Sequence, residues 1–522
     1  MKKSHFSYLQ LHLLLILTLY TAAEAFAQKT PRVCYEIFVR SFCDSNHDGI
    51  GDINGITSKL DYLQDLGVEA IWLTPVTLSP SYHKYDIVDY KKIDPEYGTL
   101  EDYKRLIVEA HKRNILVIKD LVINHTSSKH FWFQEAQKGK DNPYRNYYSW
   151  MTPQKIDSMG IAVREKTADS WETQPWHWAK KGDDEKYYGM FWSGMPDLNM
   201  DNSKVREEIY EIGRFWLQDV GIDGFRLDAA KHIYPDWEAE KCHAFWQEFR
   251  EKMEAVKPNV YIVGEVWTSA EKVAPFFRGL KANFHFDLSF ALQKIVKAEQ
   301  DSVALVKLLL SNYKTFAKEN PAFIDATMLT NHDQNRIGSV LSGNKNQLKV
   351  AANLLLTLTG NPFIYYGEEL GMMGVKPDEN IREAFLWDKR FDDKCRTNWR
   401  KPQFNTDSKV TPLKQQSTDP NSLYNHYKKL IHLRNNQPAL WQILPPNLQK
   451  SQINQKGILA FIRPHASGDL LVIHNLSNKS HEIVLKNGEE AFNKVIFKTE
   501  NSQLHTNHTC QLAPYSVLVL GK

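Results

Sequence analysis

Short apolar runs alternate with amphipathic stretches along most of the chain from Pro31 onward. The runs have the length of buried strands, and the stretches between them repeat apolar residues at helical spacing. Residues 56–66 carry such a repeat, and Gly67 follows where a helix C-cap belongs. The strands expected from this pattern are 33–39, 70–73, 115–123, 222–227, 260–263, 282–286, 323–329 and 362–366. The clearest further helices are 100–112, 205–220, 239–256, 348–357 and 424–434.

Eight strands that are mostly separated by helices predict an α/β fold, a closed parallel (β/α)8 TIM barrel. A doubly wound open sheet is the alternative, but the glycine-rich phosphate loop that would support it does not follow the first strand. We therefore expect a catalytic (β/α)8 barrel that comprises residues 28–125 and 200–435.

Two long stretches break this alternation. Residues 126–199 are too long for a simple strand-to-helix loop and mix Asn, Gly, Lys and Trp without a period. We interpret them as an inserted subdomain B after strand three, standing over the carboxyl-terminal face of the barrel. Residues 436–522 carry short alternating strands with Asn, Gly and Ser turns between them. This pattern predicts a C-terminal antiparallel β-sandwich domain.

Residues 1–27 have the pattern of a signal peptide. Two lysines precede an apolar run at 13–19, and Ala-Phe-Ala at 25–27 offers a cleavage site between small residues. The apolar run is too short to span a membrane, and no later stretch is long enough. We therefore expect an exported protein, periplasmic or extracellular, without a transmembrane segment.

The composition narrows the class of protein. Of 522 residues, 42% are hydrophobic and 24% are charged, which is ordinary for a globular protein. The net charge of +3 is negligible at this size, so nucleic acid is not an expected partner. The five Cys are few and odd in number, so they define no disulfide framework; one bridge is possible, and its pairing stays open. We expect a monomer.

Charge gathers at the end of the apolar strand 222–227. Because side chains alternate along a strand, Arg226 and Asp228 point the same way. A guanidinium beside a carboxylate lowers the pKa of the acid, which would prepare an anionic nucleophile. A structural ion pair at a strand end explains the same residues, and this stretch alone does not decide between the two.

Polar residues also stand where other predicted strands end. Strand three leads to His125, strand five to Glu265, and strand seven to His332 and Asp333. In a TIM barrel the carboxyl ends of the strands meet at one rim, where catalysis takes place. Three acids and two histidines at corresponding strand ends are hard to explain as helix caps.

Such a set suits glycoside cleavage, in which one carboxylate attacks the anomeric carbon and a second carboxyl group protonates the leaving oxygen. Arg226 beside Asp228 favours the ionised acid, whereas the apolar Val266 and Trp267 beside Glu265 favour the protonated one. We therefore predict that Asp228 is the nucleophile and Glu265 the acid/base.

The chain resembles the α-amylase family, glycoside hydrolase family 13. The motifs that carry the resemblance are Asp120-x3-Asn124-His125, Met195-Pro-Asp-Leu-Asn199, Gly224-Phe-Arg-Leu-Asp228, Gly264-Glu-Val-Trp267, Asn331-His-Asp333 and the strand-eight stretch 360–369. They occur in the family's order, and the resemblance extends from about residue 32 to the C-terminus.

The resemblance implies a role for each matching residue. Asp228 would be the nucleophile, Glu265 the acid/base and Asp333 the stabiliser of the transition state. The residues implied to bind the sugar are Tyr85, Asp86, His125, Arg226, Lys231 and His332. Tyr85 lies in the stretch 83–86, His-Lys-Tyr-Asp, where the family usually has Gly in place of Lys84.

A calcium site is predicted at residues 44–52, Asp-Ser-Asn-His-Asp-Gly-Ile-Gly-Asp. The spacing of side-chain oxygens at loop positions one, three, five and nine, with a carbonyl at seven, suits calcium. The expected ligands are Asp44, Asn46, Asp48, the Ile50 carbonyl and Asp52. A polar loop of Asx turns is the alternative. The α-amylase resemblance alone implies a second calcium between barrel and insert, held by Asn124, Asp197 and the His232 carbonyl.

The substrate is expected to be an α-glucan, starch or maltooligosaccharides. A small Ala229 leaves room for a leaving sugar attached through its 4-oxygen, and Lys231 can donate to that sugar. These residues favour endo-hydrolysis of α-1,4 bonds. The stretches 83–86 and 195–199 resemble members related to oligo-1,6-glucosidases and neopullulanases, so a neopullulanase, a cyclomaltodextrinase or an exo-acting α-glucosidase is the alternative. A non-catalytic glucan-binding protein is a further alternative, but both Asp228 and Glu265 are present.

Overall fold

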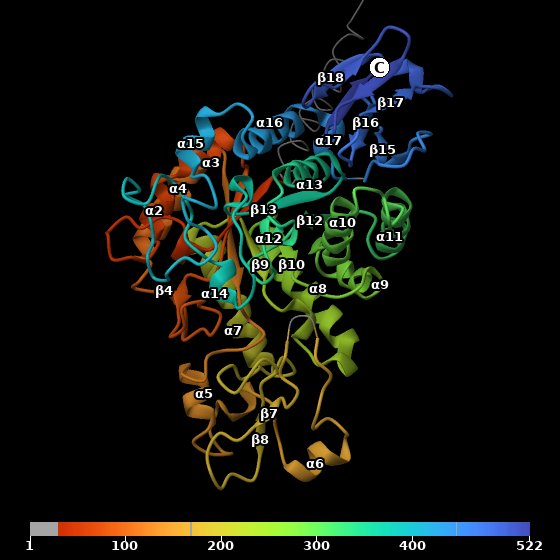
Figure 1. Cartoon of the computed structure of the whole chain (residues 1–522). Coiled ribbons are helices and arrows are strands. Elements are labelled where there is room, and N and C mark those ends of the chain that lie inside the picture. The colour runs from red at the N-terminus through yellow and green to blue at the C-terminus, as the bar shows by residue number, and fades with distance from the viewer. Residues whose placement is uncertain (1–29, 168–169, 445) are drawn as a thin grey trace, which may run out of the picture.

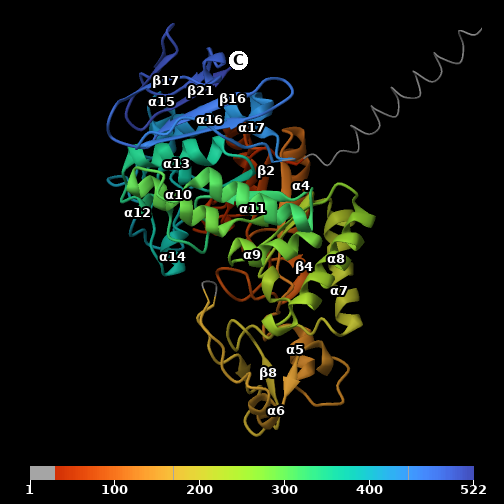
Figure 2. The same cartoon turned by 90° about the vertical axis from the view of Figure 1, so that its right-hand side faces the viewer.

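The computed structural model describes residues 30–167, 170–444 and 446–522. The predicted signal peptide lies outside these residues. A central barrel carries the stretch between residues 122 and 202 at one end and the C-terminal residues at the opposite end (Figures 1 and 2). In the described part of the chain, none of the helices has both the length and the apolar character needed to cross a membrane.

Eight strands close into the barrel, and each pairs in parallel with its neighbours. They are β1 (Cys34–Ile37), β2 (Ala70–Leu73), β5 (Leu116–Leu121), β9 (Gly224–Leu227), β10 (Tyr261–Gly264), β11 (Ala282–Phe284), β12 (Ile324–Met328) and β13 (Asn361–Tyr365). Their order around the barrel follows the chain, with β1 between β13 and β2. The predicted (β/α)8 fold is therefore confirmed, with each strand inside or within one residue of its predicted range.

Helices surround the barrel. They are α2 (Ile53–Ser58), α3 (Leu60–Leu66), α4 (Leu100–Lys112), α7 (Ser203–Arg214), α8 (Ala239–Val256), α9 (Ala270–Val273), α10 (Phe286–Ala298), α11 (Leu305–Glu319), α12 (Ile337–Val340), α13 (Lys345–Thr357), α14 (Asp378–Ile381), α15 (Leu413–Thr418), α16 (Leu423–Asn436) and α17 (Pro438–Trp441). Gly67 ends α3 with φ 96°, a left-handed conformation that suits glycine, and this confirms the predicted cap.

Three helix predictions need correction. The helix expected over 56–66 is two helices, α2 and α3, which meet at Lys59. The helix expected over 205–220 ends at Arg214 and continues as a π-helical turn, Phe215–Val220. Helices α10 and α11 were not predicted. The exposed stripe of α10 contains Phe290 as well as Lys294 and Lys297, so an apolar residue interrupts the polar face by which the sequence would reveal the helix.

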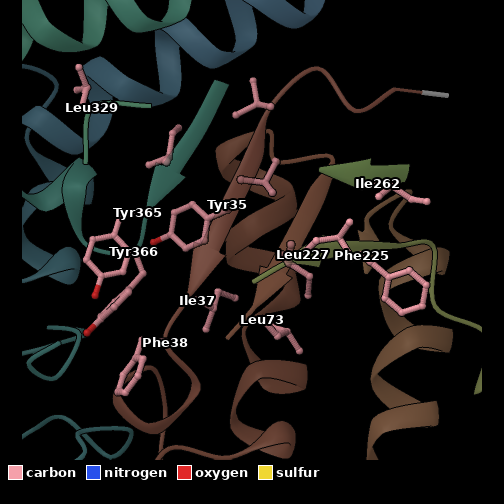
Figure 3. Packing of buried hydrophobic residues seen from close by; sticks show 14 of the residues in the cluster. Tyr35, Ile37, Phe38, Leu73, Phe225, Leu227, Ile262, Leu329, Tyr365 and Tyr366 are labelled. Atoms are coloured by element: carbon pink, nitrogen blue, oxygen red, sulfur yellow. The ribbon is translucent and has the colours of Figure 1, made fainter. Parts of the chain in front are cut away.

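Alternating side chains of the strands divide the core in two. Tyr35, Ile37, Phe225 and Leu227 point outward and pack under the helices (Figure 3). The inward-facing set fills the barrel interior and includes Cys34, Trp72, Ile118, Val263, Phe284, Met328 and Phe363. The closed sheet is thus buried on both faces, as its nearly continuous apolar strands require.

The chain between β5 and α7 forms a small unit of its own. It contains α5 (Phe131–Ala136), α6 (Pro153–Ser158) and a sheet of β6 (Trp150–Met151), β8 (Lys186–Tyr188) and β7 (Trp176–His177). A hairpin of β3 (Thr77–Leu78) and β4 (Asp89–Ile93) projects from the barrel after β2. Single bridges join His125 to Asp197 and Tyr148 to Leu198, so this insert is fastened to the rim of the barrel.

The C-terminal residues form two antiparallel sheets around a separate apolar core. One sheet contains β14 (Gln449–Lys450), β15 (Ile458–Arg463), β16 (Leu470–Asn475), β21 (Val517–Gly521) and β18 (Lys494–Lys498). The other contains β17 (His481–Val484), β20 (Thr509–Leu512) and β19 (Gln503–Leu504). Strands β15, β16, β17 and β21 correspond to the alternating stretches expected at 458–462, 470–473, 482–485 and 516–520. Strands β14, β18, β19 and β20 were not predicted, because they are short or largely exposed.

One disulfide joins Cys43, after β1, to Cys395 in the loop after β13, across 352 positions of sequence. This pairing was left open by the sequence, because the two cysteines meet only when β1 and β13 become neighbours. Cys34 and Cys510 are buried outside this disulfide, and the buried Cys242 thiol donates to the Ala230 carbonyl at 3.4 Å.

Candidate active site

The side chain of Arg226 lies at the centre of the rim and is completely buried. Its Nη1 donates to Asp228 Oδ1 at 2.7 Å and to Asp120 Oδ1 at 3.0 Å. Its Nη2 lies 2.8 Å from Glu265 Oε2, an ion pair without hydrogen-bond alignment. Asp120 belongs to β5, while Asp228 and Glu265 follow β9 and β10 directly. The barrel thus brings three carboxylates from neighbouring strands to one guanidinium.

The structure corrects the prediction that Arg226 gives Asp228 a lowered pKa, and the guanidinium also contacts Glu265. Burial raises the pKa of Asp228 well above its usual range, although Arg226 opposes the rise. Burial raises the pKa of Glu265 as well, and the charge of Asp333 adds to the rise. One guanidinium is shared among three buried carboxylates, and the charge of Glu265 adds to the rise in the pKa of Asp228.

The two carboxylates of this pair are held differently. Asp228 accepts an aligned, charge-assisted hydrogen bond from Arg226. Glu265 Oε2 accepts a hydrogen bond from the backbone N–H of Ala229 at 3.0 Å. A charge-assisted bond favours the ionised form more strongly than a backbone bond does. The two carboxylates therefore share burial but differ in their hydrogen bonds, and the bond from Arg226 favours the ionised form of Asp228.

A second cluster of charge surrounds Asp333. Its Oδ2 lies 3.0 Å from His332 Nε2, and its Oδ1 accepts from Arg382 Nη2 at 2.8 Å. Burial disfavours the carboxylate, but His332 and Arg382 outweigh it and hold the pKa of Asp333 well below its usual range. His332 in turn contacts Glu36 through Nδ1. Burial disfavours the charged ring, yet Asp333 and Glu36 raise the pKa of His332 to about 10.

Tyr85 connects the two clusters. Its hydroxyl donates to Asp120 Oδ2 at 3.0 Å and lies 2.6 Å from His332 Nε2. The ring stacks on that of His332, with centroids 5.4 Å apart and planes 3° from parallel. His125 Nε2 lies 3.1 Å from the Tyr85 carbonyl, and burial lowers the pKa of His125 to about 4. The ring of His125 is therefore neutral at pH 7.

Lys84 stands where the family usually has glycine, and its backbone shows why: φ is 63°, in the left-handed region. Its buried Nζ lies 2.8 Å from Asp94 and 2.7 Å from Glu96. These ion pairs hold the residue in a conformation that glycine adopts without strain. The left-handed conformation of Lys84 is thus held by ion pairs, and the next residue, Tyr85, lines the cavity described below.

A cavity of about 370 Å³ opens over these residues. Of the predicted site residues, Tyr85, His125, Asp228, Glu265 and Asp333 line it. Arg226 and His332 lie behind the wall and act through the side chains they hold. Asp86 and Lys231 are not among the described residues that line this cavity. Asp86 is buried and accepts hydrogen bonds from Ser79 and Ser81, so it shapes the loop that carries Tyr85.

Lys231 lies elsewhere than expected. It lines a neighbouring cavity of about 900 Å³, and both cavities have Trp267 in their walls. The structure therefore does not place Lys231 in the cavity that Asp228 and Glu265 line, and the expected contact with the cleaved bond is not found. Lys231 is placed to meet only a substrate that extends past Trp267.

Sequence reasoning missed Arg382, Asp378 and Glu36. Arg382 lines the cavity, contacts Asp333 and Asp378 and donates from Nε to the His332 carbonyl at 3.0 Å. It lies between α14 and the long loop that follows, where no strand end or repeated pattern marks it. Glu36 occupies a strand whose burial gives no sign of its function. The sequence offered one indirect signal for Arg382: the three acids predicted at the rim carry more negative charge than Arg226 can balance, so a further cation was to be expected.

The predicted calcium loop is occupied by its own hydrogen bonds. Asp44 accepts from the N–H of His47 at 2.6 Å and of Gly49 at 2.8 Å. Asp52 accepts from the N–H of Gly55 at 2.7 Å and caps α2. In the described part of the chain, no three His, Cys, Asp or Glu side chains are grouped as metal ligands. The oxygen donors suit calcium, and each carboxylate has lone pairs beyond those used.

The second predicted set lies where the insert meets the rim. The Asp197 carboxyl accepts from the Met190 N–H at 3.1 Å, and burial raises its pKa to about 8. Asn124 is buried next to it, and His232 lines a groove with Asp197. A buried carboxyl of this kind fits a cation, since a positive charge there would offset its desolvation.

Comparisons with known proteins were made over the whole chain. The family model described as the alpha amylase catalytic domain matches residues 36–442, and that described as the alpha-amylase SusG C-terminal domain matches residues 458–519. The chain is 41% identical to alpha-amylase 3 of Dictyoglomus thermophilum over 94% of this chain and 92% of that protein. It is 34% identical to an oligo-1,6-glucosidase of Parageobacillus thermoglucosidasius over 86% of this chain and 90% of that protein.

A solved structure is similar over the same extent. The crystal structure of the alpha-amylase from H. orenii is 42% identical and superimposes with a TM-score of 0.85, covering 95% of this chain and 99% of that one. Both family models and these relatives agree on the barrel and on the C-terminal domain, whereas the activities in the relatives' names differ.

The raised pKa of His332 predicts a pH-dependent contribution to stability. A histidine whose pKa rises from 6.5 to about 10 on folding stabilises fully below its unfolded pKa and loses that stabilisation as pH rises through the folded one. We expect the free energy of unfolding, measured in urea, to fall by a few kcal/mol between pH 6.5 and 10. His332→Gln should remove much of this decline.

A second buried histidine provides the control. Burial lowers the pKa of His426 to about 3, so this ring is neutral across the tested range. His426→Gln should lower stability without changing the slope between pH 6.5 and 10. Equal slopes in the wild type and in His332→Gln would contradict the charged state assigned to His332.

Proposed function

The chain belongs to the α-amylase family, glycoside hydrolase family 13, and from this we propose that it is an exported α-amylase that cleaves α-1,4 bonds within starch and maltooligosaccharides. The observation that carries the proposal is the arrangement of Asp228, Glu265 and Asp120 around one guanidinium at the barrel rim. Hydrolysis of a glycoside needs two carboxyl groups beside one bond. Asp228 and Glu265 face the same cavity, as this requires.

In the proposed reaction, ionised Asp228 attacks the anomeric carbon while Glu265 gives its proton to the leaving oxygen. The bond between sugar and leaving oxygen breaks, and an ester forms between the sugar and Asp228. Glu265 then takes a proton from water, and the hydroxide displaces Asp228 with a second inversion, so the product keeps the α configuration. The contact of both carboxyl groups with Arg226 supports the short separation of about 5 Å that a retaining enzyme needs.

Asp333 is proposed to stabilise the transition state. Its ionised state, enforced by His332 and Arg382, sets a fixed negative charge beside the developing oxocarbenium ion. Tyr85 and His125, which line the cavity, are proposed to bind the sugar directly. Arg226 and His332 hold Asp228, Glu265 and Asp333 in position from behind.

The endo specificity rests on space around the leaving group. Ala229 lines the cavity directly after the nucleophile and is small. Beyond Trp267 the second cavity, with Lys231 in its wall, offers room for further sugars on the leaving side. An exo-acting α-glucosidase, the alternative suggested by the glucosidase relatives, has no use for a long leaving-side channel.

We further propose that calcium binds at residues 44–52 through Asp44, Asn46, Asp48, the Ile50 carbonyl and Asp52. Gly49 supports this, since its carbonyl accepts the N–H groups of Asn398 and Trp399, which pins the loop beside the disulfide. A second calcium between barrel and insert would use Asn124, Asp197 and the His232 carbonyl. Either ion would contribute stability rather than a chemical step.

The remaining proposals concern the whole chain. Cleavage after residue 27 would release an exported monomer to the periplasm or the medium. Its catalytic barrel would comprise residues 28–125 and 200–435, the insert residues 126–199, and the C-terminal domain residues 436–522.

Substitution of the paired carboxyls tests the mechanism. Asp228→Asn should keep the shape of the site and lose the nucleophile, and Glu265→Gln should lose the proton donor. Each should reduce kcat on maltoheptaose by several orders of magnitude, because the two groups act as one unit. Asp219→Asn, an exposed site on the barrel surface, is the control and should leave kcat unchanged. Proton NMR of fresh hydrolysate should show the α-anomer first; β-anomer first would overturn the retaining assignment.

A maltooligosaccharide blocked at its non-reducing end tests the endo specificity. An endo enzyme cleaves this substrate internally, because it does not need a free chain end. We expect internal products within the time in which the unblocked substrate is consumed. If the blocked substrate stays intact while the unblocked one is degraded, the enzyme is an exo-acting α-glucosidase.

Removal of calcium tests the metal proposal. A ligand that binds only the folded state stabilises by mass action, so EDTA should lower the melting temperature and added calcium should restore it. Asp48→Ala should reduce this sensitivity and lower the bound calcium by one ion per chain, whereas Asp157→Ala, an exposed acid on α6, should change neither. Metal content and melting behaviour that Asp48→Ala leaves unchanged would show that residues 44–52 form only a loop of Asx turns.

A further inference from the structure

Trp192 projects from the insert into the wall of the catalytic cavity. Its side chain is 50% exposed, although tryptophan is ordinarily well buried. The residue before it, Phe191, packs edge-on against the ring of His125, with centroids 5.3 Å apart. Because Phe191 contacts His125, which is proposed to bind the sugar, the position of the adjacent Trp192 is set by that contact.

The turn that carries Trp192 is held firmly. The Tyr187 hydroxyl donates to the Ser193 carbonyl at 2.6 Å. The N–H of Ser128 donates to the Gly194 carbonyl at 2.8 Å, which ties the turn to the segment that follows β5. A Cβ at Gly194 would lie 2.1 Å from the indole ring, so the ring covers this glycine closely. An exposed aromatic ring held in this way is preorganised for a ligand.

A second tryptophan lies at the same opening. Trp171 is 74% exposed and lines the same cavity. Lys376 and Asp378, which lie close to Arg382 in the sequence, also line the cavity. The opening thus has aromatic faces from the insert and hydrogen-bonding groups from the barrel. Sugars present apolar C–H faces and hydroxyl edges, and this combination of surfaces matches both.

The size of the cavity indicates where a longer chain must go. About 370 Å³ is at the lower end of small-ligand sites. A glucan of several sugars cannot be contained in it, and the sugars that do not enter the second cavity past Trp267 must pass over the rim. The exposed rings of Trp192 and Trp171 are the apolar surfaces that such a chain would meet there.

We propose that Trp192, with Trp171 beside it, forms a sugar-stacking subsite at the mouth of the cavity, which binds sugars of an α-glucan beyond the cleaved bond. This inference rests on the proposed function and adds to it a residue that determines chain-length preference. Stacking covers apolar surface of both ring and sugar, and it is realised only by substrates long enough to reach the rim.

Substrates of different length test this subsite. Trp192→Ala should lower kcat/KM on maltoheptaose roughly tenfold, mostly through KM. On maltotriose, which is too short to occupy both the cleavage site and the rim, the change should be less than about twofold. Trp192→Phe keeps an aromatic face and should recover most of the activity on maltoheptaose, whereas Trp192→Leu should not.

Trp178 provides the matched control. It lies in the same insert, is 47% exposed and carries the Lys186 ammonium 5.1 Å above its ring. The residues that line the catalytic cavity do not include it. Trp178→Ala should leave kcat/KM for both substrates unchanged. An equal fall for both substrates in Trp192→Ala, or the same length-dependent fall in Trp178→Ala, would overturn the proposal.

A binding measurement separates this inference from the proposed function. In the Glu265→Gln background, calorimetric titration with maltoheptaose should show affinity about tenfold weaker when Trp192→Ala is added. This arm reports on the subsite even if the wild type hydrolyses a different bond. Wild-type enzyme that leaves α-1,4-glucans intact but binds maltoheptaose through Trp192 would refute the activity and retain the subsite. Binding that is unaffected by Trp192→Ala would refute the subsite.

Discussion

The site depends on one buried guanidinium, which contacts three carboxylates although its single positive charge can balance only one of them. Arg226 contacts Asp120, Asp228 and Glu265, and the first of these is held in turn by the Trp72 indole N–H at 3.1 Å. Asp120 therefore holds the guanidinium from inside the barrel. The other two carboxyl groups are left with only part of its positive charge to stabilise their ionised forms. Burial raises the pKa of both Asp228 and Glu265, and a raised carboxyl pKa is what acid/base chemistry near neutral pH needs.

A second buried ion network supports the first from the opposite side of the cavity. Glu36, His332, Asp333 and Arg382 belong to β1, to the segment after β12 and to the loop after β13. Tyr85 joins both networks through its hydroxyl. Each ion is buried but paired, so breaking one pair leaves an uncompensated charge. The carboxyls that face the cavity thereby have fixed positions and distinct protonation states.

The loops that carry the contacts are constrained in different ways. Lys84 occupies a left-handed conformation through its buried ion pairs, and the turn at Trp192 is fastened to the segment after β5. The loop after β1 is tied to residues 395–399 by a disulfide and by hydrogen bonds to Gly49. Rigid loops on a barrel rim allow exposed groups such as Trp192 to keep a binding-ready orientation.

The sequence by itself determined the strands, the barrel and the rim that bears Asp228, Glu265 and Asp333, because strand burial and strand ends follow a local, repeating pattern. Helix α10 was not predicted, because the exposed Phe290 interrupts the polar face that would have marked it as a helix. Only the tertiary structure decided that Arg226 serves Glu265 as well as Asp228, that Lys231 lies beyond Trp267, and that Arg382 joins the site. Charge pairing and burial depend on distances between segments far apart in the chain, and no local pattern encodes those distances.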